Sequence, residues 1–248
     1  MVGVANNAFS SFQPSGGCGL IWFEATAVER EGRSNPHQLM LTEKTLGAFK
    51  SLVKEARSAA SREAGARAPL FILQLTHSGR FSKPDGLPRP VIAQRNPFLD
   101  PLRGIRPEDP VIADAELDRL GRVFLDAAGL AAEAGFDGVD IKACHGYLIG
   151  ELLGARSRTN SRYGGPFENR ARLLVETVSA VQSRFPGLIL ASRLGVFDAV
   201  PHPFGFGTAE GGAAPTGDIS AGGCGGDDPQ AEPGAPAADW SEPLSLVM

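Results

Sequence analysis

The stretch FDGVDIKACHGYLIGELLGARSRTNSRYGGPFENRARLL, residues 136–174, decides the fold. Its short apolar run from Gly138 to Cys144 is typical of a buried strand, and it follows directly on a helical pattern that Gly135 ends. A glycine-containing loop then leads into a helix from about Pro166 to Arg184, with proline at its start. A strand set between two helices is typical of βαβ units, so this stretch predicts a parallel sheet.

The rest of the chain repeats the pattern. Apolar runs predict three more strands, at residues 19–28, 69–79 and 188–197. Helical spacing predicts helices at 42 to about 64 and at 114–134, the second capped by Asp114. A long loop, residues 80–110, follows the second strand, and loops of that length are usually functional. The alternation of four strands with three helices indicates an α/β fold.

Composition excludes several classes of protein. The 248 residues carry a formal net charge of −4, with 24 basic and 28 acidic residues mixed along the chain. This gives no cationic stripe for a nucleic acid or an anionic membrane. The three cysteines, Cys18, Cys144 and Cys224, have no metal-clip spacing, so we expect no metal site and a reducing compartment. No secretory signal or long apolar run is present, which predicts a cytoplasmic protein.

The two ends of the chain differ from its middle. Residues 1–15 match none of the predicted strands and helices. From Thr208 to Asp239, 20 of 32 residues are Gly, Ala or Pro, so this segment is expected to be flexible. Residues 240–248 then resemble the start of a helix that is cut short, with Asp239 or Ser241 as its cap and Pro243 in its first turn. The predicted domain therefore spans residues 16–207.

Polar side chains follow each predicted strand, where the loops of a parallel α/β barrel converge. The richest group is Asp140, Lys142, His145 and Tyr147. Lys142 and His145 could polarise a carbonyl, and Tyr147 could supply a proton. A conjugated alkene would then accept hydride at its β carbon. Because no side chain is a hydride source, a flavin or nicotinamide is required.

Residues 136–174 resemble the core signature of the Old Yellow Enzyme, or NADH:flavin oxidoreductase, family. GLIWFEATAV, LFILQLTHSGRFS and LASRLGVFDAVPHPFGFG resemble further strands of that family, so the similarity covers roughly Gly16 to Gly207. The resemblance implies a partial TIM (β/α)8 barrel holding the family's second to fifth strands. The first strand and the sixth to eighth are then missing, together with the phosphate-binding loops after strands seven and eight. On this reading the chain is truncated at both ends.

The resemblance also implies an activity and a site. NAD(P)H would reduce FMN, which would then pass hydride to an activated alkene in a ping-pong scheme, and the chain would self-associate as family members often do. The implied roles are backbone contact with the flavin by Ala25, hydrogen bonding to its pyrimidine part by Gln74, a positive charge beside the ring from Arg193, carbonyl binding by Lys142 and His145, and proton donation by Tyr147. Lys142 departs from the family's commoner histidine.

Two other functions remain open from the residues alone. A lysine at a strand end, Lys142, could form a Schiff base with a carbonyl substrate, as in aldolase-type barrels. The chain could also be a non-catalytic remnant. Other residues have simpler readings: His77 is interpreted as structural, and Cys144 as a small buried hydrophobe rather than a nucleophile.

Overall fold

The computed structural model describes residues 18–60, 69–211 and 237–246. It contains a four-stranded sheet in the order β1-β2-β3-β4, formed by β1 (Leu20–Ala27), β2 (Leu70–Thr76), β3 (Gly138–Ile141) and β4 (Ile189–Ala191). Each neighbouring pair is parallel. The predicted parallel α/β sheet is therefore confirmed, with β4 shorter than the expected 188–197.

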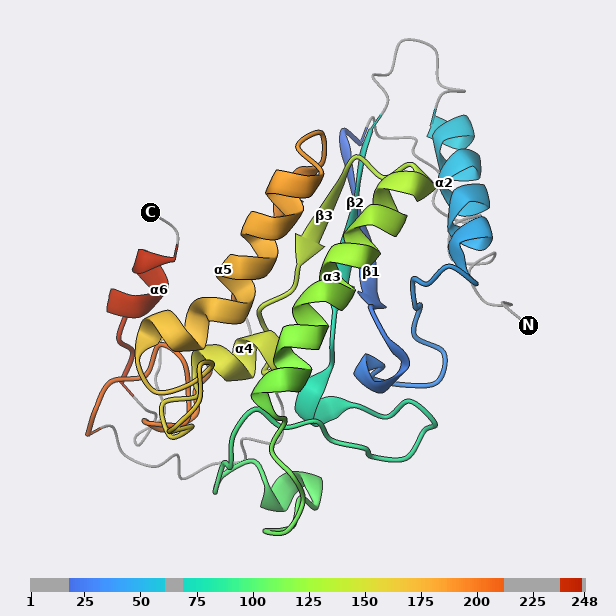
Figure 1. Cartoon of the computed structure of the whole chain (residues 1–248). Helices are drawn as coiled ribbons and strands as arrows, with labels where there is room; N and C mark the ends of the chain where they lie inside the picture. The colour runs from blue at the N-terminus through green and yellow to red at the C-terminus, as the bar shows by residue number, and fades with distance from the viewer. Residues whose placement is uncertain (1–17, 61–68, 212–236, 247–248) are drawn as a thin grey trace.

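Three long helices cover one face of the sheet (Figure 1). They are α2 (Leu46–Ala60), α3 (Asp114–Ala134) and α5 (Phe167–Arg184). Short helical elements occupy the loops: η1 (Arg30–Gly32), η2 (Gly79–Phe81), η3 (Pro101–Arg103), α4 (Leu148–Leu153) and α6 (Ser241–Ser245). The strands point toward the end of the sheet where α4 and the long loop of residues 80–110 lie (Figure 1).

The start of α3 corrects one prediction. Asp114 does not cap the helix, because Ala113 is the N-cap residue and Asp114 is already helical. The Asp114 carboxylate instead accepts hydrogen bonds from the Arg158 guanidinium, the Ser161 hydroxyl and the backbone N–H of Arg162. It therefore ties the loop before α5 to the first turn of α3.

The hydrophobic core lies between the sheet and the long helices. Phe23 of β1 packs 5.5 Å from the ring of Phe71 and meets the ring of Phe136 edge-on at 4.9 Å. Leu73 and Val139 join them, each with no exposed surface. Burying a large apolar side chain completely stabilises the fold by about 1.5–3 kcal/mol, so this layer accounts for much of the stability of the domain.

The opposite face of the sheet is not covered by the long helices, and it is exposed toward the amino ends of β1 and β2. Strand residues alternate between faces, so Leu20, Trp22, Leu70 and Ile72 share the face that the helices do not cover. Leu20 is 44% exposed, Trp22 46% and Leu70 43%. Gln74 and Asp140 lie further along this same face, in register with each other.

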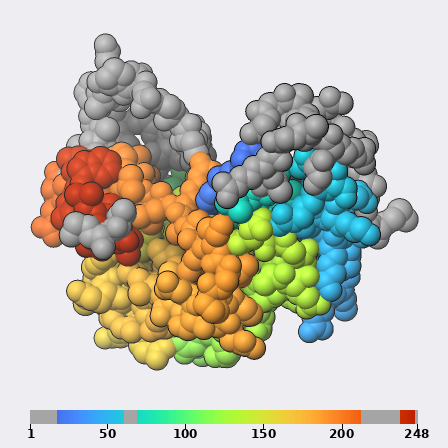
Figure 2. All heavy atoms as spheres, turned by 90° about the horizontal axis from the view of Figure 1, so that it is seen from above, coloured from blue at the N-terminus to red at the C-terminus, as the bar shows by residue number. Residues whose placement is uncertain are grey.

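The described C-terminal residues pack beside α5. Thr208 forms an antiparallel bridge with Ala238, and the Glu242 carboxylate of α6 accepts hydrogen bonds from Arg156 and Arg170. Figure 2 shows α6 against the segment just before residue 211. A five-residue helix begins at Ser241, but the predicted cap is wrong: Trp240 is the N-cap residue instead of Asp239 or Ser241, while Asp239 Oδ1 accepts a hydrogen bond from the Ser241 N–H. Most of the predicted flexible segment, residues 212–236, lies outside the described residues, as do residues 1–17.

Candidate active site

The candidate site forms at the carboxyl ends of β2, β3 and β4. Gln74 and Asp140 are paired in register. Lys142 follows Asp140 by two residues, just past the end of β3, and Arg193 follows Ala191 of β4, the partner of Asp140, by two residues. The Asp140 carboxylate accepts hydrogen bonds from the Gln74 amide and from the backbone N–H of Arg193, the second at 2.7 Å. These strand ends therefore meet on the sheet face that the long helices do not cover.

A tight turn after β3 places the remaining side chains. His145 and Gly146 both have positive φ, at 63° and 60°, and Tyr147 is the N-cap residue of α4. A positive φ is costly for a residue with a side chain, and such conformations cluster at functional sites. The end of this turn is fixed to the segment after β2, because the Leu148 N–H donates a hydrogen bond to the His77 carbonyl at 3.2 Å.

The side chains of this turn gather around Tyr147. The Lys142 ammonium lies 4.5 Å from the centroid of the Tyr147 ring, and the His145 ring meets Tyr147 edge-on with centroids 6.2 Å apart. Phe81 of η2 packs against Tyr147 at 5.9 Å. Lys142 is only 5% exposed. The structure thus brings together the three residues predicted to bind a carbonyl and donate a proton.

The electrostatics of the cluster favour a neutral imidazole. Burial, followed by the positive charges of Lys142 and Arg193, lowers the pKa of His145 below its ordinary value of 6.5. His145 is therefore uncharged at neutral pH and can donate one ring N–H. Together with the Lys142 ammonium it supplies two kinds of donor for a carbonyl oxygen, one charged and one neutral.

Ala25 lies at a bulge in β1 next to Gln74. The register between β1 and β2 shifts between Phe23 and Thr26, which leaves Glu24 and Ala25 opposite Gln74. The Ala25 carbonyl accepts a hydrogen bond from Gln38 Nε2 at 2.8 Å. One carbonyl lone pair is thus engaged, and the second can still accept a hydrogen bond in the predicted contact with a cofactor.

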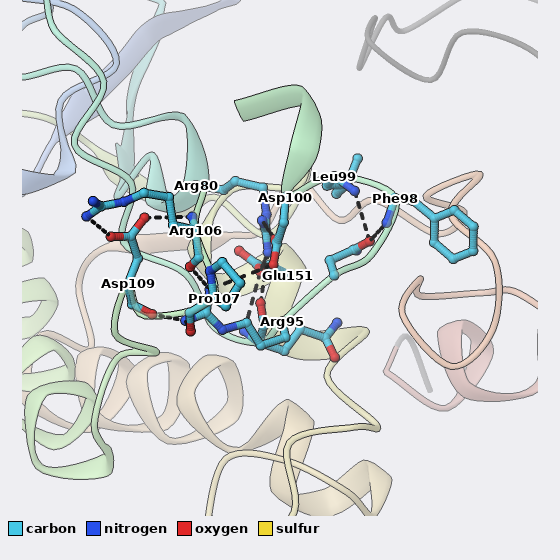
Figure 3. Close-up of polar contacts among 11 residues, drawn as sticks. Arg80, Arg95, Phe98, Leu99, Asp100, Arg106, Pro107, Asp109 and Glu151 are labelled. Atoms are coloured by element: carbon cyan, nitrogen blue, oxygen red, sulfur yellow. Dashed lines mark hydrogen bonds and ion pairs between the residues drawn. The ribbon is translucent and has the colours of Figure 1, made fainter. Parts of the chain in front are cut away.

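A buried ion-pair network supports α4 and the long loop (Figure 3). The Arg80 guanidinium donates to the carboxylates of Asp100 and Glu151 and, at 2.9 Å, to the Gln94 carbonyl. Burial raises the pKa of Glu151, and the charge of Arg80 opposes that effect. The sequence analysis missed this network, although Glu151 stands out as the one charge within the apolar helix LIGELL.

His77 has a structural role, in agreement with its interpretation from the sequence. Its Nδ1 accepts the Gly79 N–H at 3.1 Å, and its Nε2 lies 3.3 Å from the Glu29 carboxylate. Arg119 of α3 donates to the same carboxylate at 2.7 Å. Cys144 is 3% exposed, which fits its reading as a small buried hydrophobe; Cys224 lies outside the described residues.

The family of this chain follows from a match over most of its length. The model of the NADH:flavin oxidoreductase / NADH oxidase family, whose members use FMN, matches residues 3–209. The chain belongs to this family. The match begins before Gly16, so it includes part of the N-terminal segment that the sequence analysis left unassigned.

Individual members of the NADH:flavin oxidoreductase family are moderately similar to the chain. An NADPH dehydrogenase of Geobacillus thermodenitrificans (strain NG80-2) is 34% identical over 195 residues, which are 77% of this chain and 52% of that protein. A putative 12-oxophytodienoate reductase-like protein 1 of Arabidopsis thaliana is 33% identical, covering 72% of this chain and 54% of that protein. The chain therefore spans about half the length of these relatives.

A solved structure agrees with the assignment. The old yellow enzyme homologue from Zymomonas mobilis superposes with a TM-score of 0.60 and 29% identity, covering 75% of this chain and 52% of that one. Among the described residues, no helix is long and apolar enough to span a lipid bilayer. Nor do the described His, Cys, Asp and Glu residues form a group of three that could hold a metal ion.

The described residues fit the ring system of FMN. Gln74 offers an amide for hydrogen bonding at the edge of a pyrimidine ring, and the cationic Lys142 and Arg193 lie at the same strand ends. The adjoining sheet face, which the long helices do not cover, carries the apolar Trp22, 46% exposed, and Ile72, 2% exposed. An aromatic ring with a polar edge suits such a surface.

Proposed function

We propose that this chain is the substrate-side half of an FMN-dependent NAD(P)H oxidoreductase that reduces activated alkenes. The observation that supports it is the gathering of Gln74, Lys142, His145, Tyr147 and Arg193 at the carboxyl end of a parallel sheet, in a chain of the NADH:flavin oxidoreductase family. In this proposal the four strands are the second to fifth of a (β/α)8 barrel. FMN, when bound, carries hydride from NAD(P)H to the alkene.

Lys142 and His145 hold the substrate carbonyl in this proposal. The ammonium is buried close to the ring of Tyr147, and the imidazole is neutral because burial and two cations lower its pKa. Hydrogen bonds from both to one carbonyl oxygen draw electron density from the conjugated double bond. That prepares the β carbon for hydride.

Tyr147 donates a proton to the α carbon. Its ring is fixed between Phe81 and His145, and its place as N-cap residue of α4 fixes its backbone. A positioned general acid typically contributes 10²- to 10⁴-fold in rate.

We also propose that the protein is cytoplasmic and self-associates. Its substrate is a small activated alkene, and it binds neither nucleic acid nor a membrane.

The test begins with FMN binding. The purified chain is titrated with FMN and followed by flavin fluorescence, and the complex is then reduced with NADPH or NADH without oxygen and reoxidised with an enone. We expect Tyr147→Phe to bind and reduce flavin normally but to slow reoxidation by the enone at least about 100-fold. Tyr163→Phe is the matched control, because the Tyr163 hydroxyl bonds Asp118 of α3 instead.

Three outcomes would contradict all or part of the proposal. Folded chain that binds no FMN would favour the non-catalytic reading. Borohydride trapping of a ketone on Lys142, without any need for flavin, would favour Schiff-base chemistry. Equal enone rates for the two tyrosine variants would remove the role of Tyr147 while leaving flavin binding intact.

A further inference from the structure

Asp140 is a fully buried carboxylate on the sheet face that the long helices do not cover. It belongs to the short strand β3 and has no exposed surface. Burying a carboxylate is costly unless hydrogen bonds replace its hydration. The hydrogen-bond donors around the Asp140 carboxylate therefore explain why it can be buried here.

Asp140 accepts from three different parts of the sheet. Its Oδ2 accepts from the Trp22 indole N–H at 3.0 Å and from the Gln74 amide, and its Oδ1 accepts from the Arg193 backbone N–H at 2.7 Å. The donors come from β1, from β2 and from the residue that follows β4 by two. One carboxylate thus connects all four strands on the face where the flavin ring is proposed to lie.

The bond to Asp140 fixes which way the Gln74 amide faces. A carboxylate has no hydrogen to donate, so the Gln74 nitrogen, and not its oxygen, must face it. Gln74 Oε1 therefore points away from Asp140. Within residues 18–60, 69–211 and 237–246, no group donates a hydrogen bond to this oxygen.

Arg193 is held by its backbone in the same way. Its N–H donates to Asp140, and its carbonyl accepts the Ala143 N–H at 3.0 Å. The chain after β4 is thereby fixed against the chain after β3. This contact fixes the point at which the Arg193 side chain leaves the backbone. The guanidinium on that side chain is one of the two charges that lower the pKa of His145.

We propose that Asp140 is a positioning residue that sets the hydrogen-bond polarity of the flavin site. By holding the Gln74 nitrogen, it makes Gln74 present an acceptor, which suits the imide N–H of the flavin pyrimidine ring. By holding the Arg193 N–H, it fixes the strand end that carries the cation. This inference rests on the proposed function, since it concerns the same site.

The test compares FMN with FMN methylated at the imide nitrogen, which has no N–H to donate. We expect the wild-type chain to prefer FMN at least about tenfold, the effect of one hydrogen bond of about 1.4 kcal/mol. In Asp140→Asn a single amide oxygen replaces the two carboxylate oxygens that accept from Trp22, Gln74 and Arg193, so the Gln74 amide is no longer held with its oxygen toward the flavin. The preference for FMN then falls about tenfold, while affinity for the methylated analogue changes little.

Asp137→Asn is the matched control. Asp137 lies just before the amino end of β3, whereas the site lies at the carboxyl ends of the strands. Its carboxylate accepts hydrogen bonds from the Phe71 N–H and the Arg57 guanidinium. Its loss weakens the sheet without turning Gln74, so the ratio of the two affinities stays within about twofold of wild type. If Asp140 only held the sheet together, both affinities would fall alike and the ratio would be unchanged, which overturns the inference.

A measurement on the wild-type chain covers the case in which Asp140→Asn does not fold. With isotope-labelled glutamine, the side-chain carbonyl carbon of Gln74 should shift when FMN binds, while its Asp140-bound N–H stays in place. A shift confined to the N–H overturns the inference. Wild-type chain that binds no FMN overturns the proposed function as well, whereas FMN binding with an unaltered ratio in Asp140→Asn overturns the role of Asp140 alone.

Discussion

Replacing Arg80 with methionine should destabilise the domain far more than the loss of a surface ion pair. The Arg80 side chain has no exposed surface, and that of its partner Glu151 is 4% exposed. Removing the guanidinium leaves the Glu151 carboxylate buried without its counter-charge, whereas the Asp100 carboxylate keeps its 3.8 Å ion pair with Arg95. Breaking a buried pair in this way costs about 3–5 kcal/mol in the free energy of unfolding.

The loss should depend on pH in a defined direction. Burial already raises the pKa of Glu151, and Arg80 is the charge that opposes the rise, so Arg80→Met raises this pKa further. The native variant then binds a proton that the unfolded chain does not. Its stability therefore increases as the pH falls through that raised pKa, and the gap to wild type should be smaller at pH 5 than at pH 8.

Urea unfolding followed by circular dichroism measures both effects. The double variant Arg80→Met/Glu151→Gln should recover much of the loss, because no charge is then left buried without a partner. Arg30→Met is the control: Arg30 pairs with Asp85 at the surface, with side chains 53% and 33% exposed, and should cost less than about 1 kcal/mol. A loss below about 1 kcal/mol for Arg80→Met, or a double variant no more stable than the single one, would refute the reasoning.

Two further substitutions test the frame of the site. Gly79→Ala should destabilise the chain by about 1–3 kcal/mol in urea unfolding, because Gly79 has a φ of +58° and an added Cβ would lie 2.7 Å from the Leu148 backbone nitrogen. Unchanged stability would mean that the backbone at the start of α4 can move aside at little cost in free energy. Burial alone would raise the pKa of Glu29, but hydrogen bonds from His77 and a neighbouring arginine outweigh it and lower the pKa to about 2. The Glu29 carboxylate therefore contributes stability to the fold above pH 4.5, and this contribution is lost as the pH falls toward 2. Glu29→Gln should flatten the decline of the melting temperature in that range. An equally steep decline in the variant would contradict this.

The sequence predicted the sheet because its strands are continuous apolar runs. Runs such as LFILQLT and the alternation with helices of 15 residues or more left little choice of class. The six-residue α4 was missed because all its side chains are buried, which removes the periodicity that reveals longer helices. The cap at Asp114 was also predicted wrongly, since partners 44 to 48 residues away decide where that carboxylate points.

The sequence named the residues of the candidate site, but it did not predict the hydrogen bonds and ion pairs that hold them in place. Lys142, His145 and Tyr147 stand close together in the sequence, so their meeting around one turn could be foreseen. The contacts of Asp140 with Trp22 and Gln74 join residues 118 and 66 positions apart, and no local pattern encodes them. The same holds for the Arg80 bond to Glu151, which joins the long loop to α4 across 71 positions.

The half-exposed indole of Trp22 gives the molecule a built-in optical reporter. Trp22 and Trp240 are the two tryptophans of the chain, and Trp240 can be replaced by phenylalanine on the surface of the C-terminal segment. The remaining emission then comes from a ring anchored to Asp140 on the uncovered side of the sheet. Any molecule or chain that settles there must change the colour or brightness of that light, and a flavin, which absorbs where tryptophan emits, must dim it.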